Sequence, residues 1–369
     1  MNHARWRRCV AVLIAVSVTP FIFPARSASA APAPGSVLLA TPAVLPSELS
    51  SLATGKRISY ATTSVSGASL NATGLVLTPK TGKTGKTVAW GHGTTGLADQ
   101  CSPSLNQNVF WPEARAAIAA LLAKGWTVAA PDYPGLGTPS AHPYLIGQSE
   151  ARSLIDAVKA ARSLDSSLST QYAIDGHSQG GQGALFAGEI APAYDGNLVL
   201  KGVASIAPVS NAGDFAPLVP GTPGQGYLVM GLYGLQAQDP SVNAMALLAN
   251  PAKLRTPVLT SGCLNEILST YQNLTATQLL VNGVLPASVL AKLVHYVNPG
   301  QVAPSAPILL IQGMNDDAVP WPFTAELNGQ LTAYGTQPVQ FELLQNADHD
   351  QAVFQTTTLV ADWIAARFT

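Results

Sequence analysis

The chain has 369 residues, of which 47% are hydrophobic and only 11% are charged, and its formal net charge at pH 7 is −1. This length and composition are typical of a globular protein with a large apolar core, and they exclude a basic surface for nucleic acid or anionic membranes. Residues 1–30 carry four arginines and no other charged residue, so removing them changes the net charge to −5 and strengthens the same exclusion.

The first 30 residues predict an export signal. An apolar run, 9–23, follows three arginines and precedes the small-residue stretch Ala28-Ser29-Ala30, which matches a signal-peptidase site. The run contains Pro20 and is only about 15 residues long, which is short for a membrane-spanning helix. We therefore expect a secreted mature chain that begins near Ala31.

Strands and helices alternate along the predicted mature chain. The predicted strands span 58–65, 70–78, 86–90, 126–131, 172–175, 198–206, 307–313 and 339–344. The predicted helices span 111–124, 150–164, 179–191, 227–235 and 279–293. The first two strands should pair in antiparallel fashion. The alternation of the others predicts an α/β fold with a mostly parallel sheet and helices on both faces.

The most informative motif is Gly176-His177-Ser178-Gln179-Gly180, which lies where a predicted strand meets a predicted helix. In α/β-hydrolases this pentapeptide holds a nucleophilic serine on a sharp, strained turn, where glycines are needed because other backbone comes close. A glycine-rich surface turn is the alternative reading. The strand-to-helix context favours Ser178 as the nucleophile of ester or amide hydrolysis.

A serine nucleophile of this fold needs a histidine base, which follows the serine in the chain. His295 and His349 are the histidines after Ser178; His177 belongs to the turn itself, where its side chain should point away from the serine hydroxyl. His349 lies in a polar loop after the last predicted strand, at the sheet edge where the base is needed. We predict His349 as the base, with His295 as the alternative; an ordinary solvated loop histidine is the non-catalytic reading.

The acid of the triad should leave an earlier strand at the same edge. Asp316 and Asp317 follow the buried strand predicted at 307–313. Spacing alone does not separate these two neighbours, and both could merely solvate a turn. Either carboxylate could hold the imidazole of His349 in the required tautomer.

Two backbone amides should stabilise the oxyanion of the reaction. One is the amide of Gln179, the residue after the nucleophile, and the second should come from the glycine-rich loop 91–96. In that loop Thr94 is the preferred donor and Thr95 the alternative. A phosphate-binding loop is excluded because Gly96 is not followed by Lys-Ser or Lys-Thr.

The number of cysteines and the spacing of possible ligands predict whether the protein has disulfides or metal sites. Cys9 belongs to the predicted signal, which leaves Cys101 and Cys263 as an even pair in an exported protein. This favours a disulfide, with two buried thiols as the alternative. No Cys/His or carboxylate grouping has the spacing of a zinc or calcium site, so we predict no metal and no cofactor.

The segment 208–304 has helical patterns and no strand pattern. We predict that it is a helical cap inserted into a core made of 31–207 and 305–369, and that it covers the active site. Its apolar helix faces could pack against one another or line a pocket for an acyl chain, and both readings stay open.

Taken together, the motifs resemble the secretory lipase family, the group of fungal lipase A enzymes and bacterial secreted lipases. The matching stretches are Gly91–Gly96 with Cys101–Ser104, Asp132–Gly137, Gly176–Gly181 and Gly313–Pro320. The resemblance covers essentially the whole mature chain and implies an α/β-hydrolase fold. The family's acid is the aspartate of a Gly-x-x-Asp-[Asp/Glu]-x-Val-Pro stretch, which assigns Asp316, and its C-terminal histidine matches His349. The fungal members usually carry an acidic residue in the oxyanion loop where this chain has threonines.

These features predict a secreted serine carboxylic ester hydrolase of lipase or esterase type. Its substrate would be a small-molecule or lipid ester, with transient contact with lipid interfaces and no nucleic-acid partner. A serine peptidase or a polyester depolymerase is an alternative, because the same triad can cleave bonds to different leaving groups. A non-catalytic binding module is another alternative, but every residue type of the triad is present.

Overall fold

A mixed nine-stranded sheet forms the centre of the fold in a computed structural model, which describes Met1 and residues 31–368. Apart from Met1, the predicted export signal lies outside the described residues. The strand order is β1-β2-β3-β5-β4-β6-β7-β8-β9. The strands are β1 (Val37–Ala43), β2 (Ala53–Thr63), β3 (Ser69–Pro79), β4 (Thr87–Gly91), β5 (Thr127–Pro131), β6 (Gln171–His177), β7 (Val199–Ile206), β8 (Ile308–Gly313) and β9 (Val339–Leu344).

The sheet is antiparallel at one side and parallel over the rest. β1, β2, β3 and β5 pair in antiparallel fashion, and all pairs from β5 through β4 to β9 are parallel. Every predicted strand is present, and the predicted antiparallel pair is β2 with β3. The prediction of an α/β fold with a mostly parallel sheet is confirmed.

The helices vary from single turns to 18 residues. The α-helices are α1 (Ser47–Ser50), α2 (Pro112–Ala123), α3 (Gly147–Leu164), α4 (Gln179–Tyr194), α5 (Ala212–Phe215), α6 (Gln225–Gln238), α7 (Ala244–Leu247), α8 (Asn250–Lys253), α9 (Val258–Ser261), α10 (Leu264–Tyr271), α11 (Ala276–Leu279), α12 (Ala287–Val297), α13 (Trp321–Ala333) and α14 (Gln351–Ala365). Short 3₁₀ helices are η1 (Asp99–Cys101), η2 (Gln107–Val109), η3 (Ala216–Leu218) and η4 (Val281–Gly283). Within the described residues, none of the helices has the length and apolar character of a membrane span.

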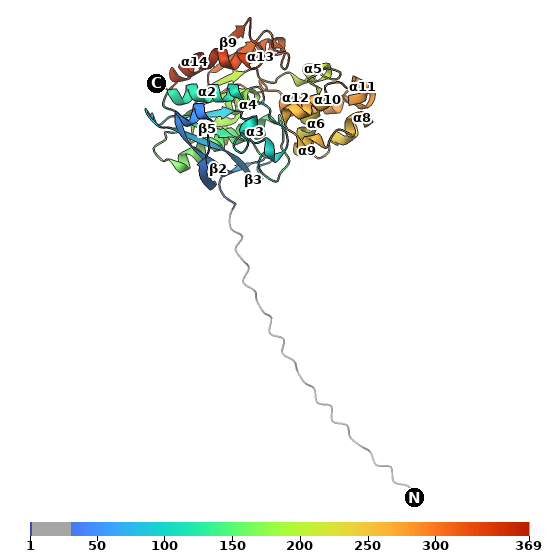
Figure 1. Ribbon diagram of the computed structural model, residues 1–369, viewed down its shortest axis with the longest axis horizontal. Helices are drawn as coiled ribbons and strands as arrows, with labels where there is room; N and C mark the ends of the chain where they lie inside the picture. The colour runs from blue at the N-terminus through green and yellow to red at the C-terminus, as the bar shows by residue number, and fades with distance from the viewer. Residues whose placement is uncertain (2–30, 369) are drawn as a thin grey trace. The chain divides into compact units, whose positions relative to one another are not determined.

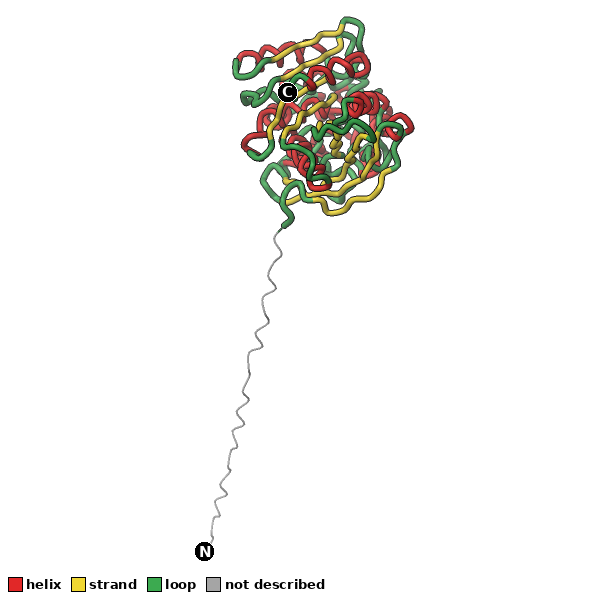
Figure 2. Tube along the Cα trace, turned by 90° about the vertical axis from the view of Figure 1, so that its left-hand side faces the viewer, coloured by secondary structure: helices red, strands yellow, loops and turns green. Residues whose placement is uncertain are grey.

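Helices cover both faces of the sheet because its buried strands are apolar on both sides. On β8, Leu309 and Ile311 belong to one hydrophobic cluster with α2 and α14, whereas Ile308 and Leu310 belong to another with α3, α4 and α13. Figure 2, with strands in yellow and helices in red, shows the strands running among these helices. Alternating side chains thus reach opposite layers, as expected of a parallel sheet covered on both faces.

The segment 208–304 packs around a hydrophobic cluster of its own. This cluster includes Val229, Leu232 and Tyr271, all fully buried, together with Tyr144 and Leu145 from the loop before α3. Figure 1 shows α6 and α8–α12 gathered at one end of the sheet. Residues 32–369 nevertheless form one compact unit. The helices of this segment therefore bury apolar side chains against one another, which is one of the two readings left open above.

Two elements differ from the sequence-based expectation. The helix predicted over 279–293 is wrong, because α11 ends at Leu279 and α12 starts only at Ala287. Between them, Asn282 and Gly283 adopt positive φ angles of 61° and 72°, and Pro286 precedes the first residue of α12. The apolar sequence pattern continues across this break, but the helical backbone conformation does not. β1 was not predicted, since most of its residues are exposed on an edge strand.

Candidate active site

Ser178 lies on a strained turn between β6 and α4. Its φ is +57° and its ψ is −117°, a combination that residues other than glycine rarely adopt. A Cβ placed on Gly180 would lie 2.1 Å from the Gly91 backbone, and one on Gly176 would lie 2.3 Å from the Gly180 carbonyl oxygen. The two glycines are thus required by close backbone approach, which is the geometry expected of a nucleophile turn.

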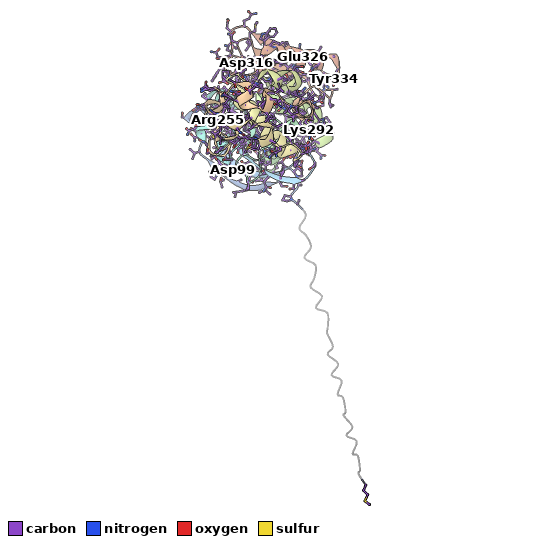
Figure 3. The ribbon with its side chains drawn as sticks, turned by 90° about the vertical axis from the view of Figure 1, so that its right-hand side faces the viewer. Asp99, Arg255, Lys292, Asp316, Glu326 and Tyr334 are labelled. Atoms are coloured by element: carbon purple, nitrogen blue, oxygen red, sulfur yellow. A yellow bond between two sulfur atoms is a disulfide. The ribbon has the colours of Figure 1, made fainter. Side chains whose placement is uncertain are left out.

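His349 is hydrogen-bonded to Asp316. The distance from its Nδ1 to Asp316 Oδ2 is 2.7 Å, and the same oxygen accepts from Gln312 Nε2 at 2.8 Å. The other oxygen, Oδ1, accepts the amides of Ala318 and Val319 at 2.9 and 2.8 Å. Asp316 lies toward the top of Figure 3. These bonds fix the carboxylate, which leaves Nε2 of His349 to act on a substrate or a nucleophile.

Asp317 and His295 have different surroundings. Asp317 is exposed and has no hydrogen bond or ion pair among the described residues. His295 lies near the end of α12, exposed, with its ring beside that of Tyr296. Of the two acids and two histidines considered from sequence, the structure brings together Asp316 and His349.

The electrostatics around His349 favour its charged form. Burial lowers the pKa of its imidazole, but the hydrogen bond and charge of Asp316, together with the charges of Asp350 and Glu113, outweigh burial and raise the pKa above 6.5. By contrast, burial holds the pKa of His177 well below 6.5. The His177 ring lies 4.5 Å from that of His349, and its Nε2 donates to the His349 carbonyl oxygen at 3.1 Å. His177 is therefore a neutral support for the loop that holds His349.

The glycine-rich loop after β4 borders Ser178. A Cβ on Gly93 would lie 3.6 Å from the Cβ of Ser178. Thr94 lines the same cavities as Ser178, its hydroxyl is 2.7 Å from that of Tyr144, and its carbonyl oxygen accepts from Trp111 Nε1 at 3.1 Å. Thr95 is fully buried, and its carbonyl oxygen accepts the amide of Leu264. Of the two threonines considered from sequence, Thr94 lines the cavities that contain Ser178 and Thr95 does not.

A buried polar network, not found from sequence, holds Gln179. Its side-chain amide donates to Glu150 Oε1 at 2.8 Å and lies 3.1 Å from Nε2 of His142. Glu150 Oε1 also accepts the amide of Leu145 at 3.0 Å. Burial raises the pKa of Glu150 to about 8, which favours the protonated carboxyl at neutral pH, while the two N–H donors act in the opposite direction. Glu150 lies four residues before the apolar Leu154, on the same face of α3. A charged residue on an apolar helix face was the sequence signal that could have revealed this network.

Two cavities meet at Ser178. The first has a volume of about 220 Å³ and mostly apolar walls, formed by residues such as Phe215, Leu228, Leu293 and Val297, with Asp317 at the part shared with the second cavity. The second, of about 530 Å³, contains His349 and is more polar. The first lies under the helices of segment 208–304, while the second opens beside α2 and the start of α14. A substrate bound at Ser178 can thus place two chemically different parts in two different spaces.

Cys101 and Cys263 form a disulfide, as predicted, with Cα atoms 5.5 Å apart and a sequence separation of 162. Cys101 is fully buried at the end of η1, and Cys263 is the residue before α10. The Leu264 amide donates to the Thr95 carbonyl oxygen at 2.8 Å beside this bridge. The disulfide therefore ties segment 208–304 to the loop that borders Ser178.

One group of side chains in the described part of the chain has the spacing of metal ligands. His177, His349 and Asp350 each offer one ligand atom, and these atoms lie within 4.8 Å of one another. However, His349 Nδ1 is occupied by Asp316, and His177 Nε2 by the His349 carbonyl oxygen. Nε2 of His349 and Nδ1 of His177 remain open, and the group is part of the polar cavity beside Ser178, where an open Nε2 can take or give a proton.

The sheet order, the strained serine turn and the paired Asp316 and His349 define an α/β-hydrolase. The chain belongs to the secretory lipase family, whose model matches residues 110–369. This result confirms the resemblance that the motifs indicated.

Individual relatives agree with this assignment. A secreted triacylglycerol lipase, LIP4, of Malassezia globosa is 26% identical over 266 residues, which are 67% of this chain and 57% of the relative. Candida antarctica lipase A has a similar fold, with a TM-score of 0.73, 19% identity, and coverage of 86% of this chain and 78% of that one. A rice cell wall degrading esterase, LipA, of Xanthomonas oryzae has a TM-score of 0.74, 23% identity, and coverage of 91% and 99%. The chain spans 57% of the length of the curated relative it matches.

Proposed function

We propose that the protein is a secreted serine carboxylic ester hydrolase of lipase or esterase type. One observation carries this proposal: Ser178, with its strained backbone, and His349 line the same cavity. Nδ1 of His349 is hydrogen-bonded to the buried carboxylate of Asp316. Membership of the secretory lipase family supports ester cleavage and export.

In the proposed mechanism Ser178 Oγ attacks the ester carbonyl and His349 Nε2 takes its proton. Asp316 holds the histidine with Nδ1 protonated and stabilises the imidazolium that forms. The amides of Gln179 and Thr94 stabilise the oxyanion; the first of these is at the start of α4, where amides have no partner within the helix. His349 then gives its proton to the departing alcohol, and water releases the acyl group by the same steps in reverse.

The two cavities suggest how the ester is oriented. The leaving alcohol must lie near His349, because that residue protonates it. His349 lines the second cavity and is absent from the walls of the apolar one. The acyl chain accordingly occupies the apolar cavity, whose walls come largely from segment 208–304, and this segment acts as a cap over the acyl site.

The proposal is tested with a fluorophosphonate probe and a panel of esters. An activated serine should be labelled at Ser178, whereas a binding module with an inert serine should remain unlabelled. p-Nitrophenyl esters of increasing acyl length, emulsified triglyceride, a polyester film and a peptide substrate then separate the possible leaving groups. Hydrolysis of the peptide but of no ester would contradict the proposal.

The raised pKa of His349 leads to a prediction for pH dependence. The base must be neutral, so kcat/KM should fall as pH decreases through the pKa of His349, with a midpoint above 6.5. Because the charge of Asp350 contributes to this shift, Asp350→Asn should move the acidic limb to lower pH. The measurement is kcat/KM for p-nitrophenyl butyrate between pH 4 and 10. A profile that is flat down to pH 4 would exclude a histidine base.

The disulfide leads to a prediction for stability. Because it closes a loop of 162 residues, chain entropy alone gives roughly 5 kcal/mol of stabilisation, and native-state strain commonly reduces this value. The Cys101→Ala/Cys263→Ala variant should therefore unfold at lower denaturant concentration. Since the bridge fixes segment 208–304, KM should rise more for long-chain esters than for acetate. Peptide mapping without reductant tests the bond itself, and two free thiols would refute it.

A further inference from the structure

The polar cavity that holds His349 is rich in carboxylates. Its lining includes Glu113, Asp317 and Asp350. Among the described residues, no lysine and no arginine lines this cavity. The nearest arginine in sequence, Arg115, forms an ion pair with Glu48 at 3.0 Å. Apart from two histidines and a tyrosine, the ionisable side chains that line this cavity in the described structure are therefore all carboxyl groups.

Glu113 is the unusual member of this group. It is 5% exposed, yet its carboxylate has no side-chain partner and no ion pair in the part of the chain that the structure describes. Burial, and then the charge of Asp350, raise its pKa to about 7, while its own backbone amide, His349 and Arg115 act in the opposite direction more weakly. Its own backbone amide, in the first turn of α2, is the hydrogen-bond partner of this carboxyl, and no cationic side chain pairs with it. A carboxylate held in this way beside a reaction centre can still attract a positively charged ligand.

Aromatic side chains line the same cavity. Trp111, Tyr227 and Phe354 are all partly exposed, so their rings are accessible from the cavity. Rings and carboxylates together are the residue types that bind an alkylammonium group, through attraction to the ring electrons and to the negative charge. A neutral hydrophobic alcohol would use the rings but not the carboxylates.

We propose that this cavity selects ester substrates whose leaving alcohol carries a positive charge, such as a quaternary ammonium. The inference rests on the proposed function, since only a hydrolase whose leaving group lies beside His349 would place that alcohol here. The acyl part remains in the apolar cavity. The cationic group of the alcohol lies close to Glu113, with Asp317 and Asp350 at the more exposed side of the cavity.

The test compares two butyrate esters of the same shape. Butyrylcholine has a cationic alcohol, and 3,3-dimethylbutyl butyrate replaces its nitrogen with carbon. The ratio of their kcat/KM values cancels effects on Ser178, His349 and the acyl cavity. We expect a ratio of about ten or more at low salt, which is the range of a carboxylate and a ring acting on a desolvated cation. A ratio near one, with both esters hydrolysed, would overturn the inference. Loss of activity on every ester would instead overturn the proposed function.

Substitution of Glu113 identifies the residue responsible. Glu113→Gln should reduce the ratio about fivefold to tenfold and keep the shape of the side chain. Glu326→Gln is the matched control, because Glu326 is exposed on α13 (labelled in Figure 3) and is absent from the lining of both cavities. This change removes one negative charge and should leave the ratio unchanged. If Glu113→Gln lowers both kcat/KM values equally, Glu113 acts only through His349 and the inference is wrong. Asp350→Asn offers a second, exposed site, where a smaller decrease of the ratio is expected.

The pH dependence of the ratio provides an independent readout. Ionisation of Glu113, with its pKa of about 7, should increase the ratio between pH 6 and 8. His349 also titrates near this range, but it affects both esters equally and so does not alter the ratio. Asp350 and Asp317 line the same cavity, and Arg115 lies two residues from Glu113 in sequence. The Glu113→Gln variant is therefore needed to show that the change of the ratio with pH comes from Glu113. A ratio that is independent of pH in the unmodified protein would contradict the inference.

Discussion

Ser178→Ala should abolish ester hydrolysis, with a decrease in kcat of about a thousandfold or more. The acyl-enzyme cannot form without the hydroxyl, and any residual rate would come from binding and the oxyanion donors. The Ser178 hydroxyl has no hydrogen-bond partner among the described residues, and the backbone keeps the same positive φ. The free energy of unfolding should therefore change by no more than about 0.5 kcal/mol.

Both quantities can be measured on the same preparation. kcat on p-nitrophenyl butyrate reports catalysis, and denaturant unfolding reports stability. Ser140→Ala, at an exposed serine before α3, is a matched control that should keep full activity. Activity of Ser178→Ala within tenfold of the unmodified protein would move the nucleophile elsewhere.

The main elements of the fold could be predicted from the sequence because its signals are local. Buried strands such as 307–313 are unbroken apolar runs, and the nucleophile turn needs glycines at 176 and 180 for backbone reasons visible in the sequence. Segment 279–293 was predicted incorrectly as one helix because its apolar residues continue through the turn at Asn282. The sequence pattern therefore gave no sign of the break in the backbone. The prediction that 208–304 caps the site stays a proposal.

The candidate site was less accessible to sequence reasoning where it depends on contacts between distant segments. Asp316 and Asp317 are neighbours that spacing alone does not separate. The family motif assigned Asp316, and the three-dimensional arrangement shows its contact with His349. Glu150, which holds Gln179 from a different helix, and Glu113, which lines the polar cavity, have no motif of their own. Their burial, and hence their altered pKa values, arise from tertiary packing.

Asp316→Asn should lower kcat by about ten-thousandfold. At present Asp316 Oδ2 accepts the proton of His349 Nδ1, which leaves Nε2 free to act as a base. An amide at this position can present its NH₂ group to Nδ1, which favours the tautomer with the proton on Nε2 and so blocks proton abstraction from Ser178. The imidazolium of the transition state also loses its negative partner.

Asp317→Asn is the matched control, since it changes the neighbouring residue, which is exposed and makes no hydrogen bond within the described structure. Its kcat on the neutral p-nitrophenyl butyrate should remain within a few-fold of the unmodified protein, because screening by solvent weakens the effect of an exposed charge. In Asp316→Asn the side-chain amide keeps one oxygen, to which the backbone amides of Ala318 and Val319 can still donate, so this variant should fold. A larger loss of activity in Asp317→Asn than in Asp316→Asn would transfer the role of the acid to Asp317, and equal small losses would mean that His349 works without a carboxylate partner.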